Sequence, residues 1–532
     1  MFRKGSGFPK MRRMLSGCLV LGLCVSVLLP GCSRGSSAAV SGTQNAKAQN
    51  ANAKNSWEID KSPVTLSIYF DSSGNLDKTW GKDPVSKKWI EDTGVNLKFS
   101  FSPGGDNSKL NALIASGTLP DMVYCSSTIP QVQQLAKHDK IWALNDLDKK
   151  YNAKVESKID PNVILTERVL WNSKNLYCAP FYWTSKAGMK DSEIPKNIMG
   201  IAVIDKVYQA IGSPKLKTTD DLISMLQKVK QQYPDLTPLQ SNRGQGNDGD
   251  GNPRLIWKAL PMANLSGRFY QDSKGDYHKY WESPDFLSLL KFENALYNDS
   301  LIDKSLEFSN NKDKFKSNEY GGKIFCDMSQ DADNIDWFNS ELHQAHPDEN
   351  WIMIDPPAIN GKLKYANDSV NGGRPDTTVL LITKNCQHPD RAIRWLDYLY
   401  SENTQISIVY GLEGQGYTVQ EGKPVATKEA MDLYNKDTDA AKNKYGMDVY
   451  FNFRINDYAT VKRYQNASPT QRDAYKVAEK YYALSFDSNG AESYSENSNE
   501  VKLASNMKEY YSSEVMHIVE GSPSNVESEY NR

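Results

Sequence analysis

Residues 88–127 read KWIEDTGVNLKFSFSPGGDNSKLNALIASGTLPDMVYCSS, and this stretch decides the fold class. Residues 95–99 alternate apolar and polar side chains, which predicts a strand with a period of two. Residues 122–124 form a short apolar run after Pro120, which predicts a second strand ending near Ser126. Strands that alternate with helices build a parallel sheet, and ligands collect at the carboxyl ends of its strands.

Two helices are expected in the same stretch, and each ends at a glycine. Trp89 and Ile90 lie on a short amphipathic helix that ends at Gly94, where a left-handed backbone is least costly for glycine. Apolar residues between 110 and 114 are spaced as on one face of a helix that ends at Gly117. The stretch therefore reads helix, strand, helix, strand, and the chain is expected to be an α/β protein.

Length and composition limit the remaining possibilities. At 532 residues the chain is too long for a single core, so two or more lobes are expected. Hydrophobic residues at 39% and charged residues at 24% are ordinary for a globular protein. The 29 Tyr and 11 Trp are numerous enough that some could line a sugar cleft, although most are expected in cores.

The N-terminus has the pattern of a signal peptide, predicted to span 1–31. Leu19 to Leu29 is an apolar run too short to span a bilayer as a stable helix. Five basic residues precede it and no acidic one: Arg3, Lys4, Lys10, Arg12 and Arg13. Their removal would change the formal charge from −2 to −7. No basic patch then remains, which argues against nucleic acid as a partner.

Two cysteines compete as the point of lipid attachment. The run Leu-Ser-Gly before Cys18 fits a lipobox better, but it precedes the apolar run. The run Leu-Pro-Gly before Cys32 stands where a signal peptidase would cut, although Pro30 departs from the usual small residue. We expect lipidation at Cys32; the alternative is a cleaved protein without lipid.

A tether is predicted at 32–61. Residues Ser33 to Ser56 are rich in Ser, Ala, Gly, Asn and Gln, and a coil of this composition reaches about 25–30 Å. Two acyl chains suffice for stable membrane anchoring. The protein is therefore expected on the outer face of the cell membrane, attached by its lipid.

Four cysteines follow the leader: Cys125, Cys178, Cys326 and Cys386. They are scattered, each near the end of an apolar run, and no CxxC or Cys/His spacing indicates a metal. Buried free thiols are expected because an unpaired Cys behaves as a small hydrophobic residue. A Cys125–Cys178 bridge stays open at this point.

Several runs resemble one family. Asp-Thr-Gly-Val at 92–95, KLNALIASGTLPDMVY at 109–124, ITKNCQHPDRAIRWLDYLYSEN at 382–403 and GLEGQGYTV at 411–419 are similar to the sugar-type extracellular solute-binding lipoproteins of ABC importers. The resemblance covers most of 62–520. It implies a two-lobe, periplasmic-binding-protein-like (type II) α/β fold with mixed sheets flanked by helices and a hinge between the lobes. It also implies binding without turnover.

The expected lobes are discontinuous in sequence. Lobe 1 is predicted at 62–185 with 352–410, lobe 2 at 198–350 with 411–532, and a hinge crossing at 186–197. Strands are expected at 64–70, 175–183, 201–204, 322–328 and 377–383. Helices are expected over 222–229, 254–262 and 286–292, from Pro389, near 471–484 and at 501–519. Thr218 or Thr219 is expected to cap the first of these helices.

Motifs for catalysis, cofactors and metals are weak. The glycines at 244, 246 and 249 match a dinucleotide fingerprint in letters only, because acidic residues and Pro253 occupy the helix start. Asp248 begins a calcium-like loop that fails at Pro253 and Ala259. His343 and His346 are too isolated to predict zinc. No G-x-S-x-G or H-E-x-x-H run occurs. We expect no enzyme activity, cofactor or metal.

The expected ligand site combines aromatic and polar residues at strand ends that face the lobe interface. Aromatic rings would stack on sugar rings, while carboxylates and amides would take hydrogen bonds from hydroxyls. Trp337 and Arg374 are second-line candidates. The predicted site residues are Tyr69, Asp71, Ser126, Ser127, Tyr182, Trp183, Asn247, Trp257, Asp327 and Tyr417.

The expected function follows from the resemblance. The chain is interpreted as a monomeric receptor that binds an oligosaccharide and passes it to an ABC permease. The family often has an Arg and a Trp at the second lobe's entry, whereas this chain has Ile204-Asp205-Lys206-Val207-Tyr208, so no particular ligand is inherited. Two alternatives stay open: a surface glycan-active enzyme, and a peptide- or metal-binding receptor of the same fold.

Overall fold

The computed structural model divides into Met1–Ala48 and a compact unit, Gln49–Arg532. The structure describes residues 53–72, 74–102, 107–127, 129–185, 188, 200–240, 265–266, 269–272, 274, 276–307, 312–328, 331–359, 365–367, 378–484 and 513–532. The predicted signal peptide, Cys32 and most of the predicted tether lie outside these residues.

The first sheet confirms the βαβ prediction. Strands β1 (Val64–Phe70), β2 (Val95–Phe101) and β3 (Met122–Ser126) run parallel, in the order β2-β1-β3-β13-β4. Strand β13 (Thr378–Ile382) is antiparallel to β3, so the sheet is mixed. Strand β4 is only Ala179–Pro180, much shorter than the strand predicted at 175–183.

Both faces of this sheet are buried at β1, β3 and β13, and the alternation along these strands separates the two faces, whereas the edge strand β2 exposes Asn96, Lys98 and Ser100. Leu66, Ile68 and Phe70 of β1 belong to one apolar cluster, whereas Tyr69 belongs to another on the opposite face. The same division holds for β3 and β13. A strand covered by helices on both sides carries apolar residues at consecutive positions, as 122–125 does.

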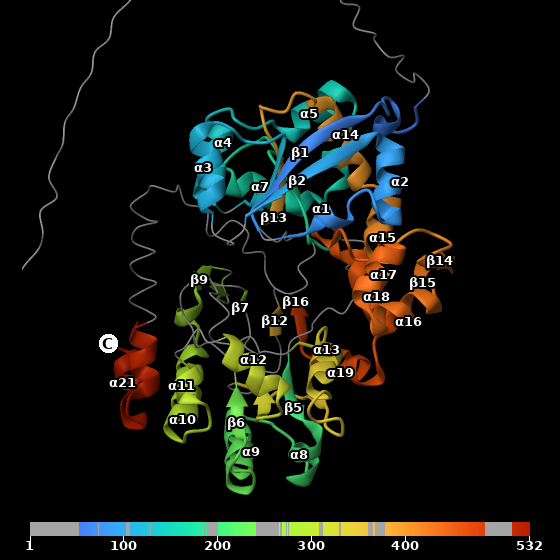
Figure 1. Ribbon diagram of the computed structural model, residues 1–532. Helices are drawn as coiled ribbons and strands as arrows, with labels where there is room; N and C mark the ends of the chain where they lie inside the picture. Colours follow the sequence, from blue (N-terminus) through green and yellow to red (C-terminus); the bar gives the residue numbers. More distant parts are fainter. Residues whose placement is uncertain are drawn as a thin grey trace, which may run out of the picture. The chain divides into compact units, whose positions relative to one another are not determined.

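Helices cover these faces. On one side lie α3 (Ser108–Ser116) and α4 (Pro130–Lys137), whose Leu110, Val132 and Leu135 join the cluster of Tyr69. On the other side lie α2 (Pro84–Thr93), α5 (Leu144–Tyr151), α7 (Pro161–Leu170) and α14 (Pro389–Leu399) (Figure 1). Pro389 opens α14 as predicted.

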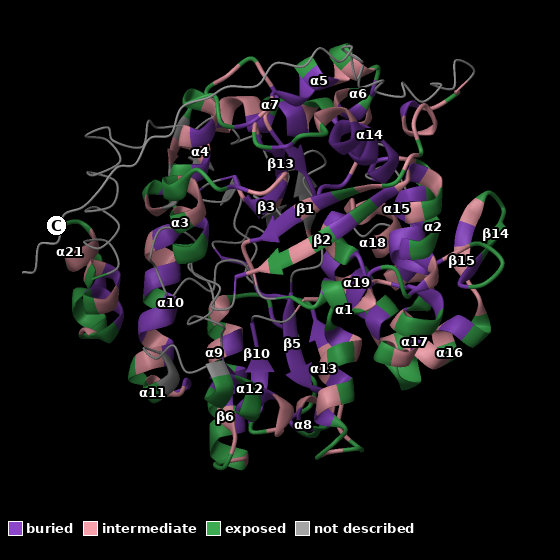
Figure 2. Ribbon diagram, turned by 45° about the horizontal axis from the view of Figure 1, so that its top comes forward, coloured by how far each residue is buried: buried purple, intermediate pink, exposed green. Residues whose placement is uncertain are grey.

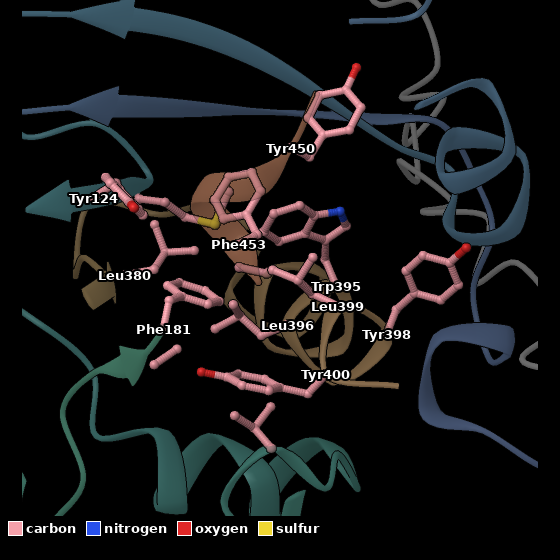
Figure 3. Close-up of a cluster of buried hydrophobic side chains, with 14 of the residues drawn as sticks. Tyr124, Phe181, Leu380, Trp395, Leu396, Tyr398, Leu399, Tyr400, Tyr450 and Phe453 are labelled. Carbon is pink, nitrogen blue, oxygen red and sulfur yellow. The ribbon is translucent and has the colours of Figure 1, made fainter. Parts of the chain in front are cut away.

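Aromatic side chains dominate the larger of the two clusters. Phe453 lies between the rings of Tyr124 and Trp395, with centroid distances of 6.0 and 5.6 Å (Figure 3). Phe181 stacks on Tyr400 at 5.7 Å. Aromatic rings bury large apolar areas and prefer such edge and offset contacts. Much of the high aromatic content therefore packs in this core.

The second sheet has its own core. Its order is β11-β5-β10-β6, built from Trp351–Ile354, Ile201–Ile204, Ile324–Asp327 and Thr237–Gln240. Strand β10 runs parallel to β6 and antiparallel to β5, so this sheet is also mixed. Its apolar residues form a cluster separate from those of the first sheet, which establishes two lobes.

Helices of the second lobe follow the predicted spacing. Helix α9 (Thr219–Gln232) buries Leu222, Met225, Leu226 and Val229, and its outer face is exposed (Figure 2). Thr218 caps it, with Asp221 completing a capping box. Helices α10 (Phe286–Asn298), α13 (Ile335–Leu342) and α19 (Pro469–Glu479) complete the cover.

Two features of the chain course differ from the predicted lobe bounds. Trp351–Ile354 pairs with β5, so the boundary predicted at 352 falls within a strand of the second sheet. Tyr417, Val449 and Phe453 pack in the first sheet's cluster, although 411–532 was assigned to the second lobe. The chain therefore stays with the first lobe until about the start of α18 (Asn456–Asn466), and this division remains a proposal.

Further elements complete the described residues. Helices not predicted from sequence include α16 (Lys428–Lys436) and α17 (Thr438–Tyr445), which pack on each other. The remaining elements are η1 (Ser56–Glu58), α1 (Leu76–Thr79), α6 (Val155–Lys158), α8 (Asp205–Ala210), β7 (Leu265–Ser266), β8 (Phe269–Gln271), β9 (Tyr277–Lys279), η4 (Tyr280–Glu282), α11 (Lys304–Glu307), α12 (Lys312–Tyr320), β12 (Tyr365–Asn367), α15 (Glu402–Tyr410), β14 (Tyr417–Gln420), β15 (Lys423–Ala426), η5 (Phe451–Phe453), β16 (Tyr482–Leu484), η6 (Pro523–Asn525) and α21 (Val526–Tyr530).

Candidate functional site

The carboxyl edge of the first sheet gathers several predicted residues. Phe70 pairs with Phe101 and with Tyr124, so β1, β2 and β3 end together. Strand β13 begins at the same edge, because Thr378 pairs with Ser126. Asp71, Ser126 and Ser127 lie at this edge, where loops can vary without disturbing the sheet.

Tyr69 supports Asp71 from the core. Its ring is buried, with 0% exposed, and its hydroxyl donates to Asp71 Oδ1 at 3.0 Å. The backbone N–H of Asp71 donates to the carbonyl of Tyr124 at 2.9 Å. Tyr69 was predicted to stack on a ligand, but its ring faces the helices of the first lobe. The partly exposed Asp71 is the group available at this edge.

Ser127 presents a hydroxyl with unmet hydrogen-bonding capacity. The residue is 0% exposed, and its Oγ has no hydrogen-bond partner among the described residues. Gln133 Nε2 donates to its carbonyl at 3.1 Å, which holds the turn after β3. Burial, and secondarily the charge of Asp71, raise the pKa of the neighbouring Cys125 thiol, so that thiol stays protonated.

The two aromatic residues after β4 have different surroundings. Trp183 is 2% exposed, and its Nε1 donates to the carbonyl of Pro180 at 3.1 Å, so its ring packs in the core. Tyr182 is partly exposed and has a φ of +59°, a conformation that costs a non-glycine residue energy. The backbones of Arg454 and Tyr182 are joined by a hydrogen bond of 2.9 Å.

A segment that the sequence analysis did not select also reaches this edge. The hydroxyl of Tyr124 donates to the carbonyl of Asn452 at 3.0 Å, which places η5 beside β3. Phe451 is 43% exposed, whereas Phe453 is buried. The run YFNFR at 450–454 combines aromatic side chains with a cation. Asn452 is 328 residues away from Tyr124 in the sequence, so no local pattern could predict that the two residues are in contact.

The second sheet contributes Asp327. This residue ends β10, is 0% exposed, and lies in register with Gln240 at the end of β6. The N–H of Met328 donates to the carbonyl of Gln240 at 3.2 Å, which holds the two strand ends together. Two other predicted residues of this lobe, Asn247 and Trp257, lie outside the described residues, as does Arg374.

Tyr417 belongs to the β14–β15 hairpin and Trp337 to helix α13, so neither lies on a strand of the two main sheets. Tyr417 is 6% exposed in the β14–β15 hairpin, and its ring contacts that of Tyr410 at 5.8 Å. Burial, followed by the charge of Glu413, raises the pKa of Tyr417. Trp337 is 48% exposed on α13 and packs edge-to-face with Tyr320 at 5.4 Å.

The described residues contain no group of three or more His, Cys, Asp and Glu that could hold a metal. His343 Nε2 contacts Asn350 Oδ1 at 3.1 Å, and His346 Nε2 contacts the carbonyl of Gly321 at 3.0 Å. Cys125 and Cys178 are both free and buried, which excludes a bridge between them in this structure.

Helix α18 connects the lobes. At its start, the N–H of Asn456 donates to the carbonyl of Trp183 at 2.8 Å, and Asp457 Oδ1 accepts from the N–H of Ser185 at 2.8 Å. Near its end, Arg463 pairs with Asp333 of the second lobe. The predicted crossing at 186–197 lies outside the described residues except for 188. Among the described residues, α18 is a segment that contacts both lobes.

Within the described ranges, no helix is both long and apolar enough to cross a bilayer.

Three solved structures are similar to this chain over most of its length. The alginate-binding protein AlgQ2, in a structure without calcium ion, has a TM-score of 0.58 at 17% identity, covering 89% of this chain and 99% of that one. The FusA substrate-binding protein of the S. pneumoniae ABC transporter, in complex with kestose, gives 0.60 at 17% identity, covering 88% and 94%. An HMO-binding, ABC-transporter-associated solute-binding protein of Bifidobacterium longum infantis gives 0.60 at 13%, covering 89% and 95%.

At identities this low, the TM-scores and the coverage show a shared two-lobe fold and nothing more. The comparison with curated protein sequences finds no match. The model of the family described as bacterial extracellular solute-binding protein matches residues 77–406, which is more than half of the chain. This protein is a member of the bacterial extracellular solute-binding protein family.

Proposed function

We propose that this protein binds an oligosaccharide between its two lobes and delivers it to the permease of an ABC importer. The observation that carries the proposal is the family match over residues 77–406. One structural relative was solved in complex with kestose and another is described as HMO-binding, which supports a carbohydrate as the ligand class. No catalytic step and no cofactor are part of the proposal.

The proposed binding residues come from both lobes. Asp71, Ser126, Ser127 and Tyr182 would line the first lobe's edge, and Asp327 would face them from the second. Carboxylates and hydroxyls take hydrogen bonds from sugar hydroxyls, and a partly exposed ring can stack on a sugar face. Of the remaining proposed residues, Asn247 and Trp257 lie outside the described ranges, and Tyr69, Trp183 and Tyr417 are buried.

The proposed mechanism is hinge closure. A ligand that contacts both lobes stabilises the closed population, which the permease would recognise. Helix α18 is bonded to the first lobe through Asp457 and to the second through Arg463, so a change in lobe angle must alter contacts along it. Residues 186–197 would form a second crossing.

The proposed location is the outer face of the cell membrane, with a lipid on Cys32 and the protein acting as a monomer. The first described segment, η1, already contacts the first lobe. The ring of Trp57 packs edge-to-face on Tyr398 at 5.5 Å, and Ser56 Oγ donates to Asp397. A tether would therefore begin at the surface of that lobe, beside α14.

A thermal-shift screen of the mature protein against oligosaccharides, peptides and divalent ions tests the ligand class. A ligand that binds only the folded state stabilises it and so raises the melting temperature. At a ligand concentration one hundred times Kd, the free energy of unfolding rises by about 2.7 kcal/mol. We expect at least one oligosaccharide to raise Tm. A shift with peptides or ions alone would contradict the proposal, and hydrolysis of a shifting oligosaccharide would show an enzyme instead.

A further inference from the structure

Arg454 lies against two aromatic rings at the carboxyl edge of the first sheet. Its guanidinium carbon is 5.0 Å from the centroid of the Tyr182 ring and 5.8 Å from that of Phe451. Tyr182 is one of the residues predicted to bind the ligand, and Phe451 is 43% exposed. The guanidinium therefore belongs to the same surface as the proposed sugar site.

Among the residues that the structure describes, no carboxylate is paired with this cation. Over the residues that the structure describes, the Arg454 side chain forms no hydrogen bond or ion pair, and its Nε is shielded from solvent without a partner. Asp448 acts electrostatically on Arg454 but is already paired with Lys462 at 2.7 Å. Arg463, a further neighbouring cation, is paired with Asp333. Arg454 thus differs from the other two cations.

Arg454 is only partly exposed, so its charge is incompletely solvated in the free protein. Burial lowers the pKa of Arg454, yet a guanidinium remains charged in proteins. A charge removed from water without an opposite charge destabilises the fold unless another group supplies one. Rings that pack over a guanidinium face leave its N–H edge available, and this edge matches the two oxygens of a carboxylate.

We propose that Arg454 is a specificity-determining residue that binds the carboxylate of an acidic, uronic-acid-containing oligosaccharide. The inference rests on the proposed function, since it names the class of sugar that the site prefers. The carboxylate would accept two parallel N–H donors from Arg454 while the neighbouring sugar ring packs beside Tyr182. No proton or covalent step is involved.

A purely structural role for Arg454 makes a different prediction. The backbone of Tyr182 is held by the Arg454 carbonyl and by Asn456 Nδ2, which donates to the Tyr182 carbonyl at 2.5 Å. Neither bond uses the guanidinium. Arg454→Met keeps most of the packing against the rings and removes the charge, whereas Arg454→Lys keeps the charge and removes the planar fork.

The test uses matched acidic and neutral probes in titration calorimetry. The pairs are trigalacturonate with its fully methyl-esterified form, and glucuronosyl-xylobiose with xylotriose. We expect at least one acidic probe to bind more tightly than its neutral partner. Arg454→Met should weaken that binding roughly 10- to 100-fold and change neutral binding less than about twofold. Arg454→Lys should fall between wild type and Arg454→Met.

Arg532→Met is the charge-matched control. Arg532 is 64% exposed and pairs with Glu514 and Glu529, so its loss should leave both affinities unchanged. Circular dichroism and Tm establish that each variant is folded. Equal binding of acidic and neutral probes, binding of neutral probes alone, or equal weakening of both by Arg454→Met would overturn the inference while leaving an oligosaccharide receptor intact. If no sugar binds at all, the proposed function fails together with it.

Discussion

Glu167 is an acidic residue placed where acidic residues are rarely tolerated. It is 1% exposed in the first lobe, and one of its oxygens accepts from Trp171 Nε1 and from Cys178 Sγ, each at 3.1 Å. The other oxygen has no partner among the described residues. Burial raises the pKa of Glu167 to about 7, against the opposing effect of these two hydrogen bonds.

This raised pKa makes the stability of the first lobe depend on pH. An acid whose pKa is higher in the folded chain contributes stability that is present below about 4.5 and is lost as the pH rises through about 7. We expect Glu167→Gln to be more stable relative to wild type at pH 8 than at pH 5, by about 1–3 kcal/mol. Urea unfolding at both values measures the difference.

Glu429→Gln, on the exposed surface of α16, is the control for this comparison. It should show the same offset from wild type at both pH values. If Glu167→Gln also shows a constant offset, the carboxyl of Glu167 titrates equally in the folded and unfolded chains and the prediction is wrong.

At the scale of elements, glycines end the two helices of residues 88–127. Gly94 ends α2 with a φ of +70°, and Gly117 ends α3 with a φ of +69°. Their surroundings differ. A Cβ at Gly94 would lie 2.2 Å from the carbonyl oxygen of Lys61, whereas a Cβ at Gly117 would meet nothing within 4 Å.

This difference predicts unequal costs for the same substitution. Gly117→Ala should cost only the left-handed strain, about 1–2 kcal/mol. Gly94→Ala should cost the same left-handed strain and, in addition, the energy of displacing the backbone at Lys61. We expect a total loss in the free energy of unfolding of about 3 kcal/mol or more. Denaturant unfolding of the two variants provides the comparison, and equal losses would mean that the chain around Lys61 yields easily.

Elements also set the limits of what local sequence could predict. Strands with a period of two and helices with one apolar face were placed correctly, as at 64–70 and 219–232. The strand predicted at 175–183 proved to be two residues long. Its apolar residues are buried through contacts with η5 and α14 and not through pairing with a neighbouring strand. Because both kinds of burial require apolar side chains, the sequence pattern is the same in either case.

At the scale of the whole molecule, two separate cores imply two units of stability. Leu226 of α9 belongs to the core of the second sheet, and Leu396 of α14 belongs to that of the first, each with 0% exposed (Figure 3 shows Leu396). Unfolding of such a chain need not be two-state, because each core can open without the other.

We therefore expect cavity variants to act on their own lobe. Leu226→Ala should destabilise the second lobe by roughly 2–5 kcal/mol and accelerate amide exchange in β5 and β10, with little change in β1 and β3. Leu396→Ala should produce the opposite pattern. Hydrogen–deuterium exchange with mass spectrometry measures both; a uniform loss of protection would show that the lobes unfold as one cooperative unit.

The sequence by itself determined the class of fold and the glycine-ended helices of residues 88–127, because each depends on spacing within a short window. It predicted buried thiols but left a Cys125–Cys178 bridge open, and the structure shows both thiols free. The sequence also placed Asp71, Ser126 and Ser127 at strand ends. The pairing of 351–354 with 201–204 required the tertiary structure, since register between distant strands is not encoded in either strand alone.

Only the tertiary structure could separate exposed from buried aromatics. Tyr69 and Trp183 have the residue types of a sugar site, yet the packing of α3, α14 and η5 removes their rings from solvent. The same packing brings Arg454 to Tyr182 from 272 positions further along the chain, and no described carboxylate is paired with its guanidinium. Residue type indicates what a side chain can do; long-range packing decides what it faces.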